Sequence, residues 1–225
     1  VVANDAISTT VAFIAPDPLR EYNTSYDLYV AASRTNAGQS IFRDYVPAIA
    51  SRNLETFDLS YKGINTSSSK SFLTIHRDTF PVQYVYGFSS DEFSYFVTVQ
   101  KQNTSTESYI SKLIRVCQAD KLYYSYAEMQ LRCMYNGVHY NLAQAGFVAD
   151  AGWKLAERMN IWAFDEVLYV VFSIGSRNTA IPTSFSALCI YPMERVRKIF
   201  TENIKACFNG IGSAGPSHSI TEVAC

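Results

Sequence analysis

The side chains with the most reactive chemistry in this 225-residue chain are five cysteines and three histidines. No cysteines show the Cys-x-x-Cys spacing of a zinc site, and too few histidines accompany them, so a metal site is poorly supported. Disulfide bonds explain the cysteines better. Because their number is odd, at least one thiol is free, pairs with another chain, or has a partner outside this segment. The cysteines are Cys117, Cys133, Cys189, Cys207 and Cys225.

Three Asn-x-Ser/Thr sequons, at Asn23, Asn65 and Asn103, predict glycosylation. Each sequon reads Asn-Thr-Ser within a polar stretch, which favours an exposed loop of a secreted protein. A chain of this Ser/Thr content can also carry one or two sequons by chance. Together with disulfides, the sequons indicate an extracellular protein.

Sequence patterns for catalysis are absent. There is no Gly-x-Ser-x-Gly elbow, P-loop, His-Glu-x-x-His or Gly-x-Gly-x-x-Gly, and residues 212–219 form a turn-rich loop without the context of a phosphate cradle. Asp165 and Glu166 directly precede an apolar run, which is more typical of a solvated strand entrance than of a general acid/base pair. We therefore expect no enzyme, no metal and no cofactor.

Charge and hydropathy exclude further classes of function. The chain has 19 basic and 20 acidic residues, a net charge of −1, and no block of like charge, so nucleic acid and an anionic membrane surface are improbable partners. The longest apolar runs, such as 166–175, fall short of the roughly 20 residues that cross a bilayer. The sequence begins without Met or a signal peptide, so we expect a piece of a longer protein.

The elements that must position these residues are mostly strands. Short aromatic and β-branched runs between turn residues predict strands at 9–15, 26–33, 71–77, 81–91, 93–102, 109–117, 122–133 and 166–175. The turn Ser-Ser-Asp-Glu and the loop of the third sequon would join three of them into an antiparallel meander.

Only 151–159 and 192–208 read as helices. Pro192 suits the first position of the second helix, whose apolar face should dock on the sheets. That face comprises Val196, Ile199, Phe200, Ile204 and Cys207. Many short strands with little helix indicate a sandwich, a barrel or a propeller, and strand-dense units at blade-sized intervals favour the propeller.

Several motifs, in order along the chain, resemble the sema domain of semaphorins, plexins and the hepatocyte-growth-factor receptor group, and most closely that of plexins. These motifs are VANDAISTTVAFIAP (2–16), RDYVPAIASRNL (43–54), YVYGFSSDEFSYFVTVQ (84–100), SKLIRVCQAD (111–120), YYSYAEMQLRC (123–133), SALCIYPMERVRKIF (186–200) and IKACFNG (204–210). The resemblance implies an all-β fold, part of a seven-bladed β-propeller with four-stranded antiparallel blades and one or two inserted helices. Residues 1–225 would then supply about three to four blades of an unclosed ring.

The resemblance also implies disulfide pairs and a ligand. It would pair Cys133 with Cys189 and Cys117 with Cys225, and leave Cys207 for a cysteine beyond this chain. A plexin-like sema domain lies in the extracellular part of a single-pass plasma-membrane protein and binds a semaphorin ectodomain. A co-receptor or homotypic sema contacts would be further partners, and this segment itself would touch no membrane.

A ligand-binding site is expected at 40–45 together with Phe57, with Arg43, Asp44 and Phe57 as the contact residues. An ordinary surface loop is the competing interpretation. The alternatives for the whole chain are a semaphorin, a receptor kinase of the hepatocyte-growth-factor receptor type and, remotely, a secreted propeller enzyme with carboxylates or a metal near the ring axis.

Overall fold

The structure is a computed structural model. It describes residues 8–211 except 18–24, 34–45, 65, 73–75, 77, 104–105 and 177–178, together with Ala3 and Ala6.

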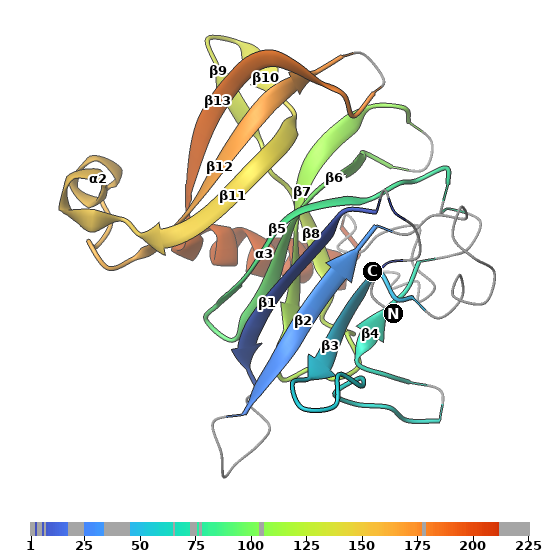
Figure 1. The fold of residues 1–225 in the computed structure, drawn as a ribbon. Coiled ribbons are helices and arrows are strands. Elements are labelled where there is room, and N and C mark those ends of the chain that lie inside the picture. Colours follow the sequence, from blue (N-terminus) through green and yellow to red (C-terminus); the bar gives the residue numbers. More distant parts are fainter. Residues whose placement is uncertain are drawn as a thin grey trace.

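Three antiparallel sheets and a small hairpin make up the described fold (Figure 1). The first sheet contains β1 (Thr10–Pro16), β2 (Tyr26–Ala32), β3 (Ile49–Asn53) and β4 (Ser69–Lys70), in that order. The second contains β5 (Gln83–Ser90), β6 (Phe93–Lys101), β7 (Tyr109–Cys117) and β8 (Ala127–Gln130). The third contains β11 (Leu142–Asp150), β12 (Glu166–Gly175) and β13 (Pro182–Pro192). The hairpin pairs β9 (Cys133–Tyr135) with β10 (Val138–Tyr140).

The sheets lie side by side, with their first strands adjacent: β1 contacts β5, and β5 contacts β11. These three strands finish at the same end of the sheets, which we call the lower end, as drawn in Figure 1; the opposite end is the upper end. Side chains from facing sheets form two separate cores, one between the first and second sheets and one between the second and third. The second sheet is therefore covered on both faces, and β6 is buried along nearly its whole length.

Two glycines allow the first strands of neighbouring sheets to approach closely. A Cβ on Gly87 of β5 would lie 2.8 Å from the Phe13 ring of β1, and a Cβ on Gly146 of β11 would lie 2.7 Å from the Tyr86 ring of β5. In each pair an aromatic ring of one sheet occupies the space beside a glycine of the next. Phe147, next to Gly146 and so on the opposite face of β11, is 61% exposed.

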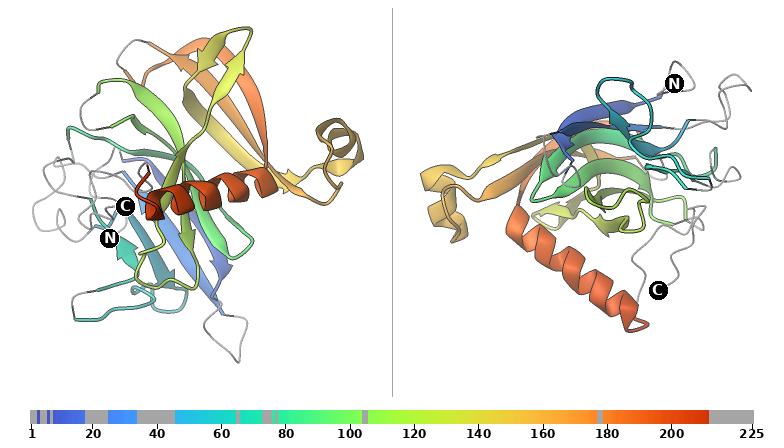
Figure 2. Two further views of the ribbon diagram at one scale, coloured as in Figure 1. Left: turned by 180° about the vertical axis from the view of Figure 1, so that it is seen from behind. Right: turned by 90° about the horizontal axis from the view of Figure 1, so that it is seen from below.

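Two helices are added to the sheets. Helix α2 (Gly152–Met159) connects β11 to β12 and projects from the lower end. Helix α3 (Met193–Phe208) follows β13 and crosses the side of the sheets that faces the viewer in the left view of Figure 2. Met193, Val196, Phe200 and Cys207 form the buried face of α3. Arg115 of β7 lies between this helix and the second sheet, with its guanidinium 4.5 Å from the centre of the Phe200 ring.

Most predicted elements are present, with corrections at particular positions. The meander of β5, β6 and β7 is confirmed, and both helices occur where expected. Pro192 is the N-cap of α3 and not its first helical residue, because its ψ of 126° still belongs to the extended strand β13. Ile199 and Ile204 were expected in the buried face but are exposed.

Two predicted strands were wrong in extent. The segment 122–133 forms only β8 and the first residue of β9, because turns occupy its first half. The described residues of 71–77 belong to no named strand, and the remaining residues of that segment lie outside the described part of the chain.

Candidate binding surface

The loop that joins β3 to β4, residues 54–68, begins with a tightly hydrogen-bonded turn. The Asn53 side-chain oxygen accepts the backbone N–H groups of Glu55 and Thr56, at 2.8 and 3.1 Å. The Phe57 N–H donates to the Asn53 carbonyl at 2.9 Å, and Arg52 donates from Nη1 to the Phe57 carbonyl at 2.8 Å. Such a side-chain-capped turn is the usual role of Asn at the start of a loop.

Phe57 is held in an unusual conformation by this turn. Its φ of 59° lies in the left-handed region, which costs a side chain other than glycine about 1 kcal/mol or more. Its ring is 58% exposed, so burial does not offset that cost. The turn therefore presents a large apolar side chain to solvent in a fixed direction.

The second half of the loop is fixed by Ser68, which is buried. Ser68 donates from Oγ to the Ser51 carbonyl at 2.9 Å and accepts the Tyr61 N–H at 3.1 Å. These bonds fold the loop back against β3, and they leave Tyr61 and Ile64 exposed. We call Phe57, Tyr61 and Ile64 together the Phe57 patch.

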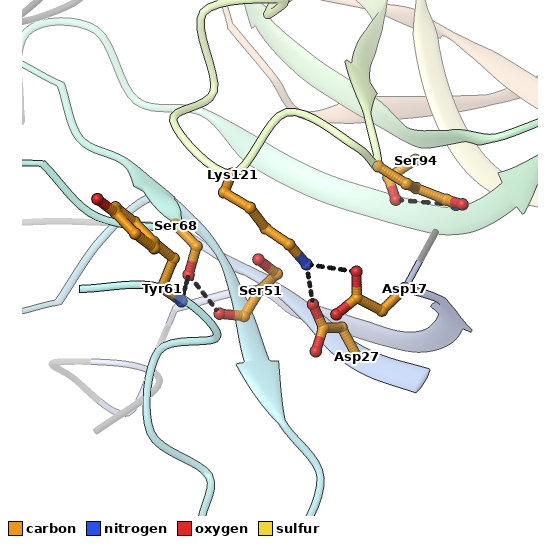
Figure 3. A network of polar contacts seen from close by, with 8 residues as sticks. Asp17, Asp27, Ser51, Tyr61, Ser68, Ser94 and Lys121 are labelled. Atoms are coloured by element: carbon orange, nitrogen blue, oxygen red, sulfur yellow. Dashed lines mark hydrogen bonds and ion pairs between the residues drawn. The ribbon is translucent and has the colours of Figure 1, made fainter. Parts of the chain in front are cut away.

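A buried charged cluster lies beside the base of this loop and joins the first two sheets (Figure 3). Lys121, in the connection between β7 and β8, contacts Asp17 at 2.8 Å and Asp27 at 3.1 Å. Both carboxylates are buried, and both are paired with the same ammonium group. Burial, and then these carboxylates, raise the pKa of the nearby Tyr29 hydroxyl above its usual range.

This surface consists of exposed apolar side chains on a hydrogen-bonded loop. The Phe57 patch offers apolar area on a rigid support, without a nucleophile activated by a neighbouring base. No group of three or more potential metal ligands occurs among the residues that the structure describes. Exposed aromatic side chains on a fixed backbone are typical of a protein-binding surface.

The predicted contact residues have different outcomes. Phe57 lies in the patch, whereas Arg43 and Asp44 lie outside the described residues. Sequence reasoning missed Tyr61 and Ile64. Ile64 had a usable signal, because an isolated aliphatic residue in the polar stretch Gly-Ile-Asn-Thr-Ser has no place in a buried strand.

The cysteines agree with the expected pairing in one case and depart from it in two. The structure contains the bond between Cys133 of β9 and Cys189 of β13, with the two Cα atoms 5.8 Å apart. Cys117 was expected to pair with Cys225. This was wrong, because the thiol of Cys117 is free at the end of β7. Cys207 is disulfide-bonded in this chain and does not need a cysteine beyond it. Among the described cysteines, Cys117 is the one with a free thiol; Cys225 lies outside the described residues.

Of the three sequon asparagines, only Asn103 is described. It is exposed in the loop between β6 and β7, at the upper end. Asn23 and Asn65 lie outside the described residues. Asn103 is therefore on the end of the sheets opposite to the Phe57 patch.

Comparisons with known proteins agree with this geometry. The sequence model of the Sema domain family matches residues 143–221. Plexin A3 of Danio rerio is 33% identical over 189 residues, which is 75% of this chain, and human Plexin-A2 is 32% identical over 190 residues. The solved structure of the Plexin A4 full extracellular region matches 95% of this chain with a TM-score of 0.74 and 26% identity. This chain is a segment of a plexin-type sema domain.

The sema fold accounts for the sheets, because sema domains are β-propellers and the three sheets are neighbouring blades. Similarity to a plexin extracellular region implies an extracellular, cell-surface location. The chain spans about a tenth of the length of the curated plexins and 26% of the Plexin A4 extracellular chain. In the part of the chain that the structure describes, neither helix is long and apolar enough to span a bilayer.

Proposed function

We propose that this chain is part of the ligand-binding propeller of a plexin-like cell-surface receptor, and that its ligand is a semaphorin ectodomain. The parent protein would be a single-pass plasma-membrane protein in which this segment binds and does not catalyse. The segment would supply three neighbouring blades of a seven-bladed ring. The similarity to plexins along three quarters of the chain supports this proposal.

The Phe57 patch is the observation that supports particular residues as the binding site. Its side chains are exposed although the loop is held by hydrogen bonds from Arg52, Asn53 and Ser68. A rigid loop loses little conformational entropy on binding, so exposed aromatic area contributes more to affinity. We propose Phe57 as the central contact, with Tyr61 and Ile64 as further contacts on the same loop. Arg43 and Asp44 stay proposed contacts on the sequence alone.

The two nearest alternatives are a semaphorin and a receptor kinase of the hepatocyte-growth-factor receptor type. Similarity to Plexin A3, Plexin-A2 and Plexin A4 favours the plexin-like receptor over both. The receptor hypothesis and the semaphorin hypothesis differ in the partner that they require. A plexin-like receptor should bind a semaphorin, whereas a semaphorin should bind a plexin.

The test is binding of the parent ectodomain to a panel of dimeric semaphorin ectodomains, measured by surface plasmon resonance. We expect saturable binding to at least one class, and a loss of tenfold or more in affinity for Phe57→Arg, because a charge would replace a central apolar contact. Loss of one aromatic anchor commonly costs about 2 kcal/mol or more, which exceeds the roughly 1.4 kcal/mol of a tenfold loss in affinity.

The matched control is Ile181→Arg, which places the same charge on an apolar residue of similar exposure at the upper end. This variant should bind as the wild type does. No binding to any semaphorin by a folded, disulfide-bonded ectodomain would contradict the receptor function. Equal loss in both variants would contradict the assignment to the Phe57 patch.

A further inference from the structure

A cavity of about 320 Å³ lies at the upper end of the sheets, remote from the Phe57 patch. It opens between the start of β7, the end of β8 and the hairpin of β9 and β10, and its polar lining comes from Ser111, Gln130, Arg132, His139, Tyr140 and Asn141. This volume is at the small end of the range for ligand pockets and suits a group the size of one sugar unit.

The backbone walls of the cavity are held in place without a ligand. The disulfide from Cys133 fastens one wall to β13, and the Tyr191 hydroxyl donates to the Arg132 carbonyl at 3.0 Å. On the other side, Ser111 donates from Oγ to the Asn141 carbonyl at 2.8 Å. A site that is already ordered costs less conformational entropy when a ligand binds.

The charge of the lining is positive. Arg132 supplies this charge, and no acidic side chain lines the cavity. Arg132 is exposed, and its Nε donates to Gln130 at 3.4 Å. In the described part of the chain it forms no ion pair, so most of its five N–H donors are available to a ligand.

The acidic side chains of β8 and of the loop before β7 are paired with lysines. Glu128 of β8 contacts Lys112 at 2.9 Å, and Glu107 contacts Lys101 at 2.9 Å. The guanidinium is therefore left as an unmatched positive charge at the edge of a concave, preformed site. A planar guanidinium binds carboxylate and sulfate groups through paired hydrogen bonds.

We propose that this cavity binds an anionic sugar, with Arg132 on its carboxylate or sulfate group. His139 and the Gln130 amide would contact the remaining oxygens, and the half-buried Tyr140 ring would pack against the sugar. Sugars with these groups occur outside cells, where the sema fold of this chain places it. The inference does not depend on the recognition of a semaphorin.

The test is isothermal titration of the parent ectodomain with three probes: sialyllactose, which carries a carboxylate, a heparin disaccharide, which carries sulfates, and neutral lactose. We expect saturable binding of one or both anionic probes and none of lactose. The probe that binds identifies whether a sialylated glycan or a sulfated glycosaminoglycan is the source of the sugar. Arg132→Gln should weaken the binding tenfold or more.

Lys154→Gln is the control, because it removes one exposed positive charge from α2 at the lower end. It should leave sugar affinity unchanged, and both variants should keep the wild-type melting temperature. Failure of both anionic probes to bind at about 10 mM, ten times the dissociation constant of a weak complex of about 1 mM, would overturn the proposal. So would equal binding of lactose, an unaffected Arg132→Gln, or an equal loss in Lys154→Gln. Semaphorin binding in the same preparations reports separately on the proposed receptor function.

Discussion

Arg115 shows how one side chain can attach a helix to a sheet. Its guanidinium lies 4.3 Å from the centre of the Phe93 ring and 4.5 Å from that of Phe200, so it is stacked between strand β6 and helix α3. Only 7% of the residue is exposed. A planar cation can face two rings at once, whereas a lysine ammonium cannot.

We therefore expect Arg115→Lys to lower the free energy of unfolding by about 2 kcal/mol, since both ring contacts weaken and the ammonium remains buried. Urea denaturation of the two proteins measures this difference. Arg158→Lys, an exposed substitution on α2, should change it by less than about 0.5 kcal/mol. Equal stability of the Arg115 variant and the wild type would show that the stacking contributes little.

Tyrosine burial predicts how the protein responds to high pH. Burial raises the pKa of Tyr95 to about 12, against 10.0 for a free tyrosine. The unfolded chain then loses this proton at a lower pH than the folded chain. The stabilisation from Tyr95 is complete below pH 10 and disappears as the pH rises to about 12, a loss of about 2 to 3 kcal/mol. Urea unfolding between pH 9 and 12 should show a smaller decline for Tyr95→Phe than for the wild type; parallel curves would contradict this assignment.

At the scale of residues, the sequence predicted the exposed Phe57 but not its companions. Phe57 was recognisable as an aromatic residue amid polar ones, while the fixed direction of its ring depends on hydrogen bonds from Asn53 and Arg52. The cysteines illustrate another limit. An odd count left open a free thiol, a bond to another chain and a partner outside this segment, and it could not say which cysteine was concerned. In the structure the thiol of Cys117 is free.

Among the elements, the turn between β5 and β6 contains the clearest local conflict between sequence and conformation. Asp91 and Glu92 have φ values of 49° and 64°, as a two-residue hairpin turn requires, although glycine or asparagine is usual there. Asp91 has a compensating contact, since its carboxylate lies 3.3 Å from Nε of Arg197 on α3. The exposed Glu92 side chain forms no ion pair with any residue that the structure describes.

Glu92→Gly should consequently raise the free energy of unfolding by about 0.5 kcal/mol or more, because glycine adopts this conformation without strain. Thermal and urea unfolding measure the change. The control is Glu157→Gly, in the regular helix α2, which should lower stability by about 1 kcal/mol. A loss of stability in both variants would indicate that the left-handed turn is not strained.

Helix α3 shows what periodicity can and cannot predict. Its existence and extent followed from apolar residues at three- and four-residue steps, and the structure places a helix at Met193–Phe208. The same pattern included Ile199 and Ile204, which are exposed. Periodicity identifies a stripe on the helix, but the width of the stripe that is covered depends on the curvature of the sheets beneath it.

For the whole molecule, the contacts between blades depend on the glycines of the first strands. Gly87→Ala would bring a methyl group to within 2.8 Å of the Phe13 ring. That ring cannot easily move, because it stacks on Tyr29 at 5.5 Å and packs against Phe96 at 5.4 Å. We expect a loss of about 1 to 3 kcal/mol in the free energy of unfolding.

A double-mutant cycle tests whether this clash is the cause. Adding Phe13→Leu to Gly87→Ala should restore part of the lost stability, since the smaller side chain makes room for the methyl group. Additive losses in the double variant would mean that the strain lies elsewhere. Circular dichroism in urea suffices for the measurement.

The blade architecture could be predicted only in part from the residues themselves. Strand-dense units favoured radial repetition, but a sandwich and a barrel remained open until the resemblance to sema domains decided among them. Gly87 and Gly146 were not recognised as contact sites, because their role depends on an aromatic residue more than 50 positions away in the chain. Pairings at such sequence distances leave no periodic signal.

The alternation of aromatic ring and glycine gives the row of blades a direction. Phe13 fits beside Gly87, Tyr86 fits beside Gly146, and Phe147 extends from the third blade toward the side on which a fourth would stand. The second blade thus receives a ring from the first and offers a ring to the third. During translation this ring–glycine pairing would let the blades pack together in the order of their synthesis, as subunits add to the growing end of a polar filament. The last blade made would expose an aromatic side chain until the next blade emerges from the ribosome.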